Sequence, residues 1–436
     1  MSHILFCSNP FSGHVRPGLP IATELVARGH EVSWYTGSRF ADLVASTGAR
    51  HVPLDRAPDF DEADLDATFP ERGRLRAGIP QLKFDVRHVF IDPMAMQVAD
   101  LRALLAERPV DLLVAESTFG AAVILSEQTG VPVVAYGITP LTSRSRDTAP
   151  SGLGMLPMAG PLGRLRNGCL NAFVERVLFG AEQRRFQEVR AALGVPRTRT
   201  FFMSAADAVP LYLHGTVPEF EYPRSDLAGN VRFVGALVPP VATGTQHPAW
   251  WGELSGDRPV VLVTQGTVKV DPAMLLEPAI EALADEDVLV VATTGGLDPA
   301  PILARHRAAN VRLERFIPFA DLLPHVDAVV TNGGYGGTQQ ALMHGLPVVA
   351  AGITEGKLEV GARVRWTGAG IDLRTDRATP DQVRTAVRSV LTDPSYRRAA
   401  QDLASRYAEY DAPRIAAGCI EGELARAGRL VTTPTR

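Results

Sequence analysis

The feature that most constrains this chain is a regular alternation of short apolar runs with helical patterns along its 436 residues. The runs are continuous in Val, Leu, Ile and Ala, which is typical of strands buried on both faces of a parallel sheet. Segments with helix signals lie between them, such as 17–28, with Pro17 at its start and Gly29 after its end. We therefore predict an α/β protein with right-handed crossovers. The runs expected to form strands are 3–8, 31–36, 111–116, 131–136, 260–265, 287–293, 311–316, 328–331 and 347–351.

The alternation occurs twice, with an interruption that is rich in Pro, Gly and Thr, a composition typical of linkers. We predict a first domain over 1–217, a linker over 218–257 and a second domain over 258–394. A helical segment over 395–436 is expected to pack back towards the first domain. Both domains are expected to be Rossmann-like. Because open parallel sheets bind ligands beyond the carboxyl ends of their strands, the site is expected in a cleft between the domains.

Composition excludes several classes of protein. Hydrophobic residues make up 46% of the chain and charged residues 21%, values typical of a globular protein and too apolar for a disordered one. The formal net charge of −4 provides no basic field for nucleic acid, so no nucleic-acid partner is expected. Three widely spaced cysteines indicate neither a disulfide framework nor a zinc ribbon. We see no signal peptide and no apolar run near the roughly 20 residues of a membrane span, so a cytoplasmic location is expected.

The most informative motif follows the strand expected at 328–331. Four glycines occur within residues 333–337, and a helix is expected to start near Thr338. Glycines let the backbone approach a ligand closely, and a helix N-terminus offers free N–H groups, so the motif predicts a phosphate-binding turn. The alternative is a tight strand-to-helix turn without a ligand. The motif is not a Walker A loop, and its dinucleotide glycine pattern is incomplete because Gln339 holds the third glycine position.

Two further turns follow apolar strands of the second domain. Gly266 and Thr267 come directly after the run 260–265, and another glycine pair ends the segment 293–296. The first turn is positioned to meet the same phosphates from the other side. Each signal is weak by itself.

A candidate general base lies in the first domain. His14 stands between the first expected strand and the helix that Pro17 starts, which places it at the cleft edge of the sheet. The ordinary pKa of histidine suits it to accept a proton from a hydroxyl, and such a base needs a carboxylate to orient it. Glu116 ends another buried strand at the same edge and is the candidate carboxylate. The alternative for a lone loop histidine is a surface or capping role.

These segments together resemble the family 1 glycosyltransferases of the GT-B fold, in particular the bacterial natural-product branch that contains the macrolide glycosyltransferases. The resemblance extends over nearly the whole chain. It is carried in the first half by 13–17 (Gly-His-Val-Arg-Pro) and by 25–32, and in the second half by 316–318, 322–324 and 332–347.

The resemblance implies a role for each candidate. His14 matches the base that deprotonates the acceptor hydroxyl for in-line attack on the anomeric carbon, and Glu116 matches the carboxylate that holds the imidazole. Phe316 matches an aromatic residue that stacks on the nucleotide base, and the backbone of Ile317 reads the edge of that base. No metal and no cofactor are implied, because amides and the helix dipole stabilise the leaving diphosphate. The positions matching the diphosphate binders are Gly266, Thr267, Gly334, Gly337 and Thr338.

Four departures from the family pattern leave the donor open. Asn332 replaces a histidine that contacts the diphosphate, and Gln340 replaces the acid that grips the ribose. Gly356 and Lys357, beside Glu355, replace an Asp-Gln pair that contacts the sugar, and the base partner is Glu where the family usually has Asp. UDP and dTDP sugars, and glucose and deoxysugars, therefore remain alternatives.

The expected function is inverting, metal-independent transfer of a sugar from UDP or dTDP to a hydroxyl of a small apolar acceptor, such as a polyketide or macrolide. Two less regular regions, 55–96 and 141–167, are expected either to line the acceptor or to be surface excursions. The expected acceptor contacts are Phe60, Phe84, Phe90 and Met94, for each of which a core role is the alternative. The chain is expected to be a monomer or homodimer. A non-catalytic accessory protein on the same fold, or a nicotinamide-dependent oxidoreductase, are the alternative functions.

Overall fold

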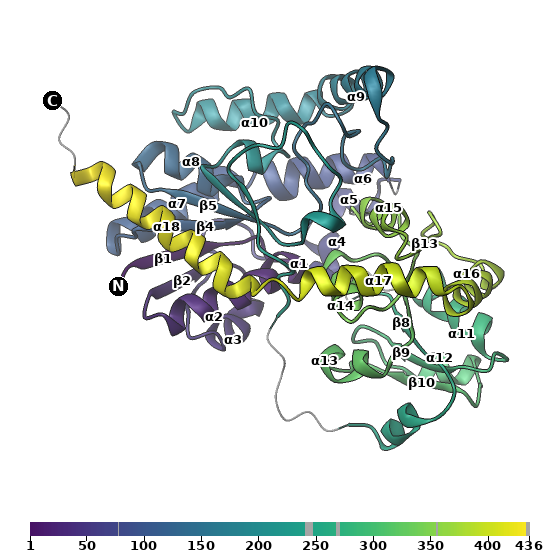
Figure 1. Ribbon diagram of the computed structural model, residues 1–436. Coiled ribbons are helices and arrows are strands. Elements are labelled where there is room, and N and C mark those ends of the chain that lie inside the picture. Colours follow the sequence, from purple (N-terminus) through teal and green to yellow (C-terminus); the bar gives the residue numbers. More distant parts are fainter. Residues whose placement is uncertain (77, 240–246, 267–270, 355, 433–436) are drawn as a thin grey trace.

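Two parallel β-sheets organise the chain in the computed structural model, which describes residues 1–76, 78–239, 247–266, 271–354 and 356–432 (Figure 1). The first sheet has the strand order β3-β2-β1-β4-β5-β6-β7, and the second has the order β10-β9-β8-β11-β12-β13. Each strand pairs with its neighbours in parallel. In both sheets the order reverses beside the first strand of the domain, β1 or β8, which is where open α/β sheets bind ligands. The prediction of two Rossmann-like domains is confirmed.

The strands are short and mostly buried. Those of the first sheet are β1 His3–Cys7, β2 Glu31–Tyr35, β3 Arg50–Val52, β4 Leu112–Glu116, β5 Val133–Gly137, β6 Leu211–His214 and β7 Val231–Phe233. Those of the second sheet are β8 Val260–Thr264, β9 Leu289–Thr293, β10 Val311–Glu314, β11 Ala328–Thr331, β12 Val348–Ala350 and β13 Gly370–Asp372. All nine expected strands are present, with ends that differ by one or two residues.

Helices cover both faces of each sheet. In the first half they are α1 Ser12–Val15, α2 Leu19–Ala27, α3 Ala41–Ala45, α4 Leu65–Thr68, α5 Pro70–Gly73, α6 Ile79–Phe84, α7 Met94–Glu107, α8 Gly120–Thr129, α9 Gly160–Phe173 and α10 Gly180–Ala192. In the second half they are α11 Leu276–Leu283, α12 Ala300–Arg305, α13 Phe319–Leu322, α14 Tyr335–Met343, α15 Lys357–Thr367, α16 Pro380–Thr392, α17 Pro394–Tyr407 and α18 Ala412–Thr432. The segments Asp85–Ile91 and Val174–Leu178 are π-helical.

The region 55–96 is more regular than its sequence indicated. It contains α4, α5, α6 and a π-helical segment that leads into α7. Helices this short bury too few residues to produce a clear 3.6-residue period, and prolines and charges interrupt the pattern. The region 141–167, in contrast, is mostly loop until α9 begins at Gly160.

The chain crosses between the domains twice. Strand β7 lies inside the segment 218–257 that we expected to be the linker, and it pairs with β6 at the edge of the first sheet. The described part of the expected helical segment 395–436, which ends at Thr432, contains two helices (Figure 1): α17 packs in the core of the second domain and α18 in that of the first. The two crossings touch, because a Cβ built on Gly235, whose φ is +89°, would lie 2.5 Å from Cβ of Tyr410.

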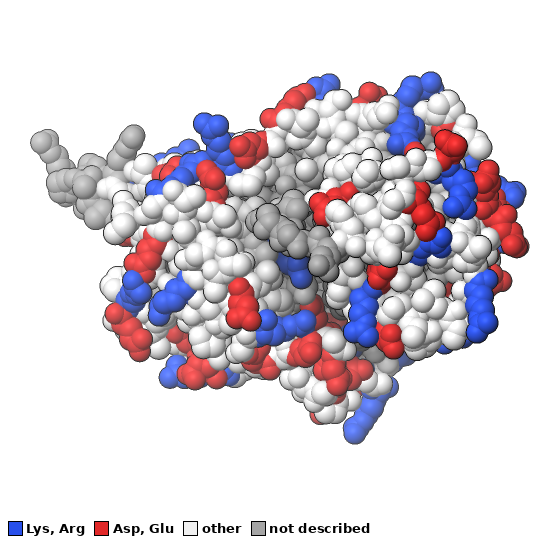
Figure 2. All heavy atoms as spheres, turned by 90° about the horizontal axis from the view of Figure 1, so that it is seen from below, with Lys and Arg blue, Asp and Glu red and all other residues white. Residues whose placement is uncertain are grey.

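Basic and acidic side chains are interspersed over the face that Figure 2 shows, in keeping with the small net charge. Within the described residues, no helix is both long enough and apolar enough to cross a membrane.

Because α18 packs on the first domain, a substitution in this helix is expected to lower the stability of that domain, although the helix lies far from it in sequence. Ile420 is fully buried against Ile21 and Leu25 of α2, so Ile420→Ala is expected to lower the free energy of unfolding by about 2–5 kcal/mol, measured by urea denaturation. Arg426→Ala on the same helix removes a largely exposed side chain and serves as the control, with an expected change within about 0.5 kcal/mol. Equal losses in the two variants would contradict the assignment of α18 to the first core.

Candidate active site

His14 and Glu116 meet at the carboxyl edge of the first sheet. Glu116 is the last residue of β4 and is 1% exposed, while His14 lies in α1, the short helix that follows β1. Because β1 and β4 are adjacent parallel strands, the segments that follow them emerge side by side. The His14 Nδ1 lies 3.0 Å from the Glu116 Oε1.

The Glu116 carboxylate is surrounded by donors. Asn9 Nδ2 donates to its Oε1 at 2.8 Å, and Thr118 donates from its hydroxyl and its backbone N–H, each at 2.6 Å. Burial by itself raises the pKa of Glu116, but the charge of His14 and the hydrogen bonds from His14 and Thr118 outweigh it, so that the pKa lies below its ordinary value. The ionised carboxylate favours the imidazole tautomer with its proton on Nδ1. No described residue hydrogen-bonds the other ring nitrogen, Nε2, which is left as an acceptor.

An aromatic wall stands beside the His14 ring. The Phe11 ring centroid is 4.9 Å from that of His14, and the Phe90 ring stacks on His14 at 6.0 Å with an interplanar angle of 16°. Phe60 packs edge-on against Phe11 at 5.1 Å. Two of the four expected acceptor contacts, Phe60 and Phe90, are therefore near the histidine. Phe11 was not singled out from the sequence, although it lies in the same loop as His14.

The other two expected acceptor contacts lie elsewhere. Phe84 contacts Phe69 and His88 instead. Its ring centroid lies 6.3 Å from that of Phe69 and 4.4 Å from that of His88. Met94 is 4% exposed and packs in the core of the first domain, where its methyl group would contact a Cβ placed on Gly120. Met94 therefore occupies a core position, which is the alternative that the sequence had left open.

A second buried carboxylate fixes the helix that carries His14. Glu62 is 2% exposed and accepts from the backbone N–H of Ser12, the first residue of α1, at 2.8 Å, and from the Ser12 hydroxyl. Arg39 Nη1 lies 3.3 Å from the same carboxylate. Glu62 therefore ties α1 to the region 55–96. The sequence offered no signal for this contact, because Glu62 is one of several acids in an aperiodic stretch.

In the second domain, Asn332 joins the two glycine turns. Its Nδ2 donates to the Gln265 carbonyl at 2.5 Å, and its Oδ1 accepts from Gly334 N–H at 3.2 Å. Gly266 has φ +78°, and a Cβ there would lie 3.1 Å from Asn332 Nδ2. The turns after β8 and β11 therefore lie against each other. Thr267, expected in the first of them, lies outside the described residues.

Helix α14 begins directly after the second turn, with Gly334 at its N-cap position. Gly337 and Thr338 lie in its first turns, and Gln340 is half-buried further along. The Thr338 side chain is fully buried, and its hydroxyl has no hydrogen-bond partner among the described residues. A buried hydroxyl without a partner is costly, and such groups are frequent where a ligand binds.

Phe316 lies over the turn that follows β9. The side chain is 65% exposed, and a Cβ on Gly296 would lie 3.1 Å from its ring. Ile317 next to it is buried, so its backbone is held in place. Lys357 begins α15 beside the turn at Gly333, where a Cβ would lie 3.5 Å from the Lys357 Cβ. Glu355, the expected sugar contact next to it, is outside the described residues.

No group of three or more His, Cys, Asp or Glu side chains in the described part of the chain is placed to hold a metal ion.

Comparisons with known proteins agree with this arrangement. Residues 279–421 match the family model of the erythromycin biosynthesis protein CIII-like C-terminal domain. The 4′-demethylrebeccamycin synthase of Lentzea aerocolonigenes is 49% identical over 422 residues, covering 97% of this chain and 99% of that protein. UDP-glycosyltransferase 2 of Phaeomoniella chlamydospora is 37% identical over 98% of this chain and 96% of its own length.

A solved structure shares the whole fold. The glycosyltransferase VinC, in complex with dTDP, superposes with a TM-score of 0.70 over 98% of this chain and 99% of its own, at 21% identity. The resemblance found in the sequence motifs is therefore confirmed. The chain belongs to the GT-B-fold glycosyltransferases of natural-product biosynthesis and is a nucleoside-diphosphate-sugar-dependent glycosyltransferase.

Proposed function

We propose that this glycosyltransferase moves a sugar from UDP or dTDP to a hydroxyl of a small apolar natural product, with inversion at the anomeric carbon and without a metal ion. The observation that carries the proposal is the pairing of His14 with the buried Glu116 beside an aromatic wall at the carboxyl edge of the first sheet. The second candidate function, hydride transfer from a nicotinamide, has no support in the glycine turns or in the relatives.

In the proposed reaction, His14 Nε2 accepts the proton of the acceptor hydroxyl while the hydroxyl oxygen attacks the anomeric carbon. The bond between that carbon and the diphosphate oxygen breaks, and its electron pair leaves with the nucleoside diphosphate. Attack opposite the leaving group inverts the anomeric centre. Glu116 accepts the hydrogen bond from Nδ1–H throughout and stabilises the imidazolium that forms, as the carboxylate does in a catalytic dyad.

The donor is proposed to bind on the second domain. Backbone N–H groups at the start of α14, with the amide of Asn332 and the hydroxyl of Thr338, would receive the diphosphate, because a helix N-terminus stabilises negative charge. Phe316 would stack on the base. These groups would stabilise the charge that develops on the leaving diphosphate in place of a metal ion.

The acceptor is proposed to lie against the partly buried rings of Phe11 and Phe90, which offer apolar area at small conformational cost, with the buried ring of Phe60 packed behind Phe11. This wall favours an acceptor with apolar surface, such as a polyketide or macrolide. The relative that makes 4′-demethylrebeccamycin supports an acceptor from natural-product biosynthesis.

The first prediction concerns the base. His14→Ala is expected to lower kcat about 100- to 10,000-fold, the usual contribution of a general base, while the Kd for UDP or dTDP stays within twofold because the nucleotide binds the other domain. Transfer is measured by mass spectrometry and nucleotide binding by calorimetry. His306→Ala, on the second domain, is the matched control and should keep normal transfer. Near-normal turnover by His14→Ala would show that His14 is not the base.

The second prediction uses the lowered pKa of Glu116. Because the folded-state pKa lies below the unfolded value of about 4.3, ionised Glu116 stabilises the fold above that pH and the stabilisation is lost as pH falls through the folded pKa. Glu116→Gln should therefore be less stable than the wild type at pH 5 and above. Below about pH 4 the difference should shrink. Urea denaturation across this range measures it, and a difference that is independent of pH would contradict an ionised Glu116.

The third prediction concerns the nucleotide base. Phe316→Ala is expected to raise the Kd for the preferred nucleoside diphosphate about 5- to 150-fold, the usual worth of one stacked base. Phe173→Ala removes an equally exposed ring from the first domain and should leave this Kd unchanged. Calorimetry with UDP and with dTDP also identifies the preferred donor base. An unchanged Kd in Phe316→Ala would show that the ring does not contribute to nucleotide binding.

A further inference from the structure

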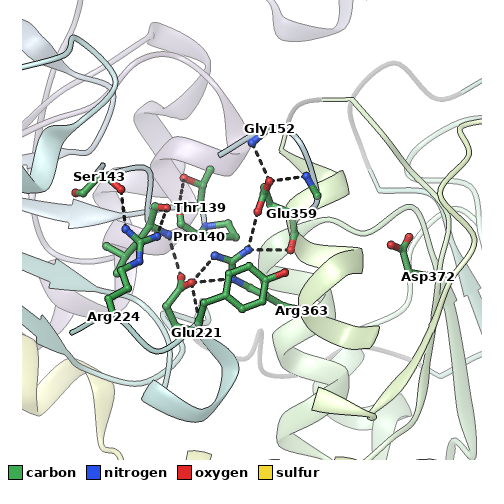
Figure 3. A network of polar contacts seen from close by, with 12 residues as sticks. Thr139, Pro140, Ser143, Gly152, Glu221, Arg224, Glu359, Arg363 and Asp372 are labelled. Carbon is green, nitrogen blue, oxygen red and sulfur yellow. Dashed lines mark hydrogen bonds and ion pairs between the residues drawn. The ribbon is translucent and has the colours of Figure 1, made fainter. Parts of the chain in front are cut away.

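A cluster of buried charges joins the two domains at α15 (Figure 3). Arg363 of α15 is 2% exposed in its side chain, and its Nε lies 3.0 Å from Oε1 of Glu221, which lies between β6 and β7 of the first sheet. Its Nη1 lies 2.9 Å from Oε2 of Glu359, one helical turn earlier. Both carboxylates are almost fully buried. The arginine therefore links a carboxylate on its own helix to one from the opposite side of the boundary.

Glu221 is satisfied on all sides and remains ionised. Its Oε2 accepts from Leu141 N–H at 3.0 Å and from His214 Nε2 at 3.2 Å. Burial by itself raises the pKa of Glu221, but Arg363, His214 and Arg224 together hold it well below its ordinary value. A buried carboxylate with this many donors is costly to disrupt, because removing one partner leaves an uncompensated charge.

Glu359 reaches further, to a loop of the first domain. Its Oε1 accepts from the backbone N–H of Gly152 at 2.9 Å and of Gly154 at 2.7 Å. Arg374, which follows β13, donates from Nη1 to the Gly154 carbonyl at 2.9 Å. Two charged side chains of the second domain therefore hold one short stretch of loop 141–159 by its backbone. This loop belongs to the region expected from the sequence to line the acceptor.

The backbone is shaped for this contact. Gly154 has φ +56°, and a Cβ there would lie 2.5 Å from Cγ and 3.0 Å from the carbonyl oxygen of Leu358, so the loop lies directly on the first turn of α15. Arg374 has φ +51° and is the only non-glycine residue with positive φ in the described part of the chain. Such a conformation is unfavourable for a long side chain and persists where surrounding contacts hold it.

The same turn of α15 also touches the donor side. Lys357, the first residue of the helix, packs against Gly333 and Gly352, which flank the donor turn and the end of β12. Loop 141–159 and the donor turn therefore contact one rigid helical turn from two sides.

We propose that Glu359 and Arg374 are positioning residues that hold loop 141–159 against the acceptor. Because the loop and the donor turn both contact α15, this helix fixes the position of the loop relative to the donor turn. The two residues contact neither substrate and act through the loop backbone. The inference rests on the proposed function, because it assigns the loop to the acceptor. Without the hydrogen bonds that Glu359 and Arg374 make to its backbone, the loop should separate locally from α15. The acceptor should then bind less tightly although the donor site is intact.

The test compares Glu359→Ala, Glu359→Gln and Arg374→Ala with the wild type in two assays. Hydrogen exchange of residues 141–159 without any ligand measures whether the loop is held, and steady-state transfer measures the acceptor KM and kcat. Glu359→Gln keeps an oxygen that can accept from both glycine N–H groups, so it should restore much of what Glu359→Ala loses. Arg374 is 41% exposed in its side chain, so Arg374→Ala reports on the loop even where Glu359→Ala does not fold.

We expect Glu359→Ala and Arg374→Ala to speed exchange at Gly152 and Gly154 and to raise the acceptor KM about tenfold, the effect of losing a charge-assisted hydrogen bond. The Kd for the nucleoside diphosphate should stay within twofold. Glu253→Ala breaks an ion pair with Arg312 inside the second domain and is the control, with unchanged exchange and KM.

Two results would overturn the proposal: wild-type exchange of the loop in both alanine variants, or faster exchange with an unchanged acceptor KM. If the wild type transfers no sugar to any acceptor, the proposed function fails instead, and the exchange data alone still decide whether the loop is clamped.

Discussion

Every paired strand in both sheets runs parallel to its neighbours, and the site depends on this constraint. Parallel strands bring all their carboxyl ends to one edge, so residues far apart in sequence emerge together. His14 and Glu116 are 102 positions apart and meet because β1 and β4 are neighbours. In the second domain, β8 and β11 are neighbours in the same way, and Asn332 joins the turns that follow them. Each domain thus brings its own group of candidate site residues together at its sheet edge.

Buried carboxylates hold in place the side chains, helices and loops whose positions the sheets alone do not determine. Glu116 orients the imidazole, Glu62 fixes the helix that carries it, and Glu221 and Glu359 join the domains. Each accepts at least one backbone N–H, so each ties a side chain to a segment of main chain. Burying a carboxylate is costly unless donors surround it, so each of these carboxylates is held in one specific geometry by its hydrogen bonds. The orientation of the His14 imidazole and the placement of loop 141–159 therefore depend on the same kind of interaction.

The sequence predicted the fold and the glycine turns because their signals are local. Runs such as 260–265 indicate buried strands without any tertiary information. The short strands β3, β7 and β13 were missed because they are partly exposed and form no continuous apolar pattern, and β6, with four buried residues, was also missed. The pairing of His14 with Glu116 was predictable because both follow strands at one edge. Glu62 and Arg363 could not be found, since their partners are 50 and 142 positions away and no motif links them. For Met94 the sequence left a contact role and a core role open, because a core methionine and a pocket methionine have the same local pattern.

The return of α18 to the first domain decides which pieces of this chain can be exchanged with a relative. The apolar side of α2 is covered by Ala416, Ala417 and Ile420, residues that lie after the whole second domain in sequence. A chimera joined once, between the sheets, would place a foreign helix on this surface and would bring a foreign residue against Gly235. The first domain is therefore discontinuous in sequence. An exchange of the second domain requires two junctions, one on each of the crossings that meet at Gly235 and Tyr410.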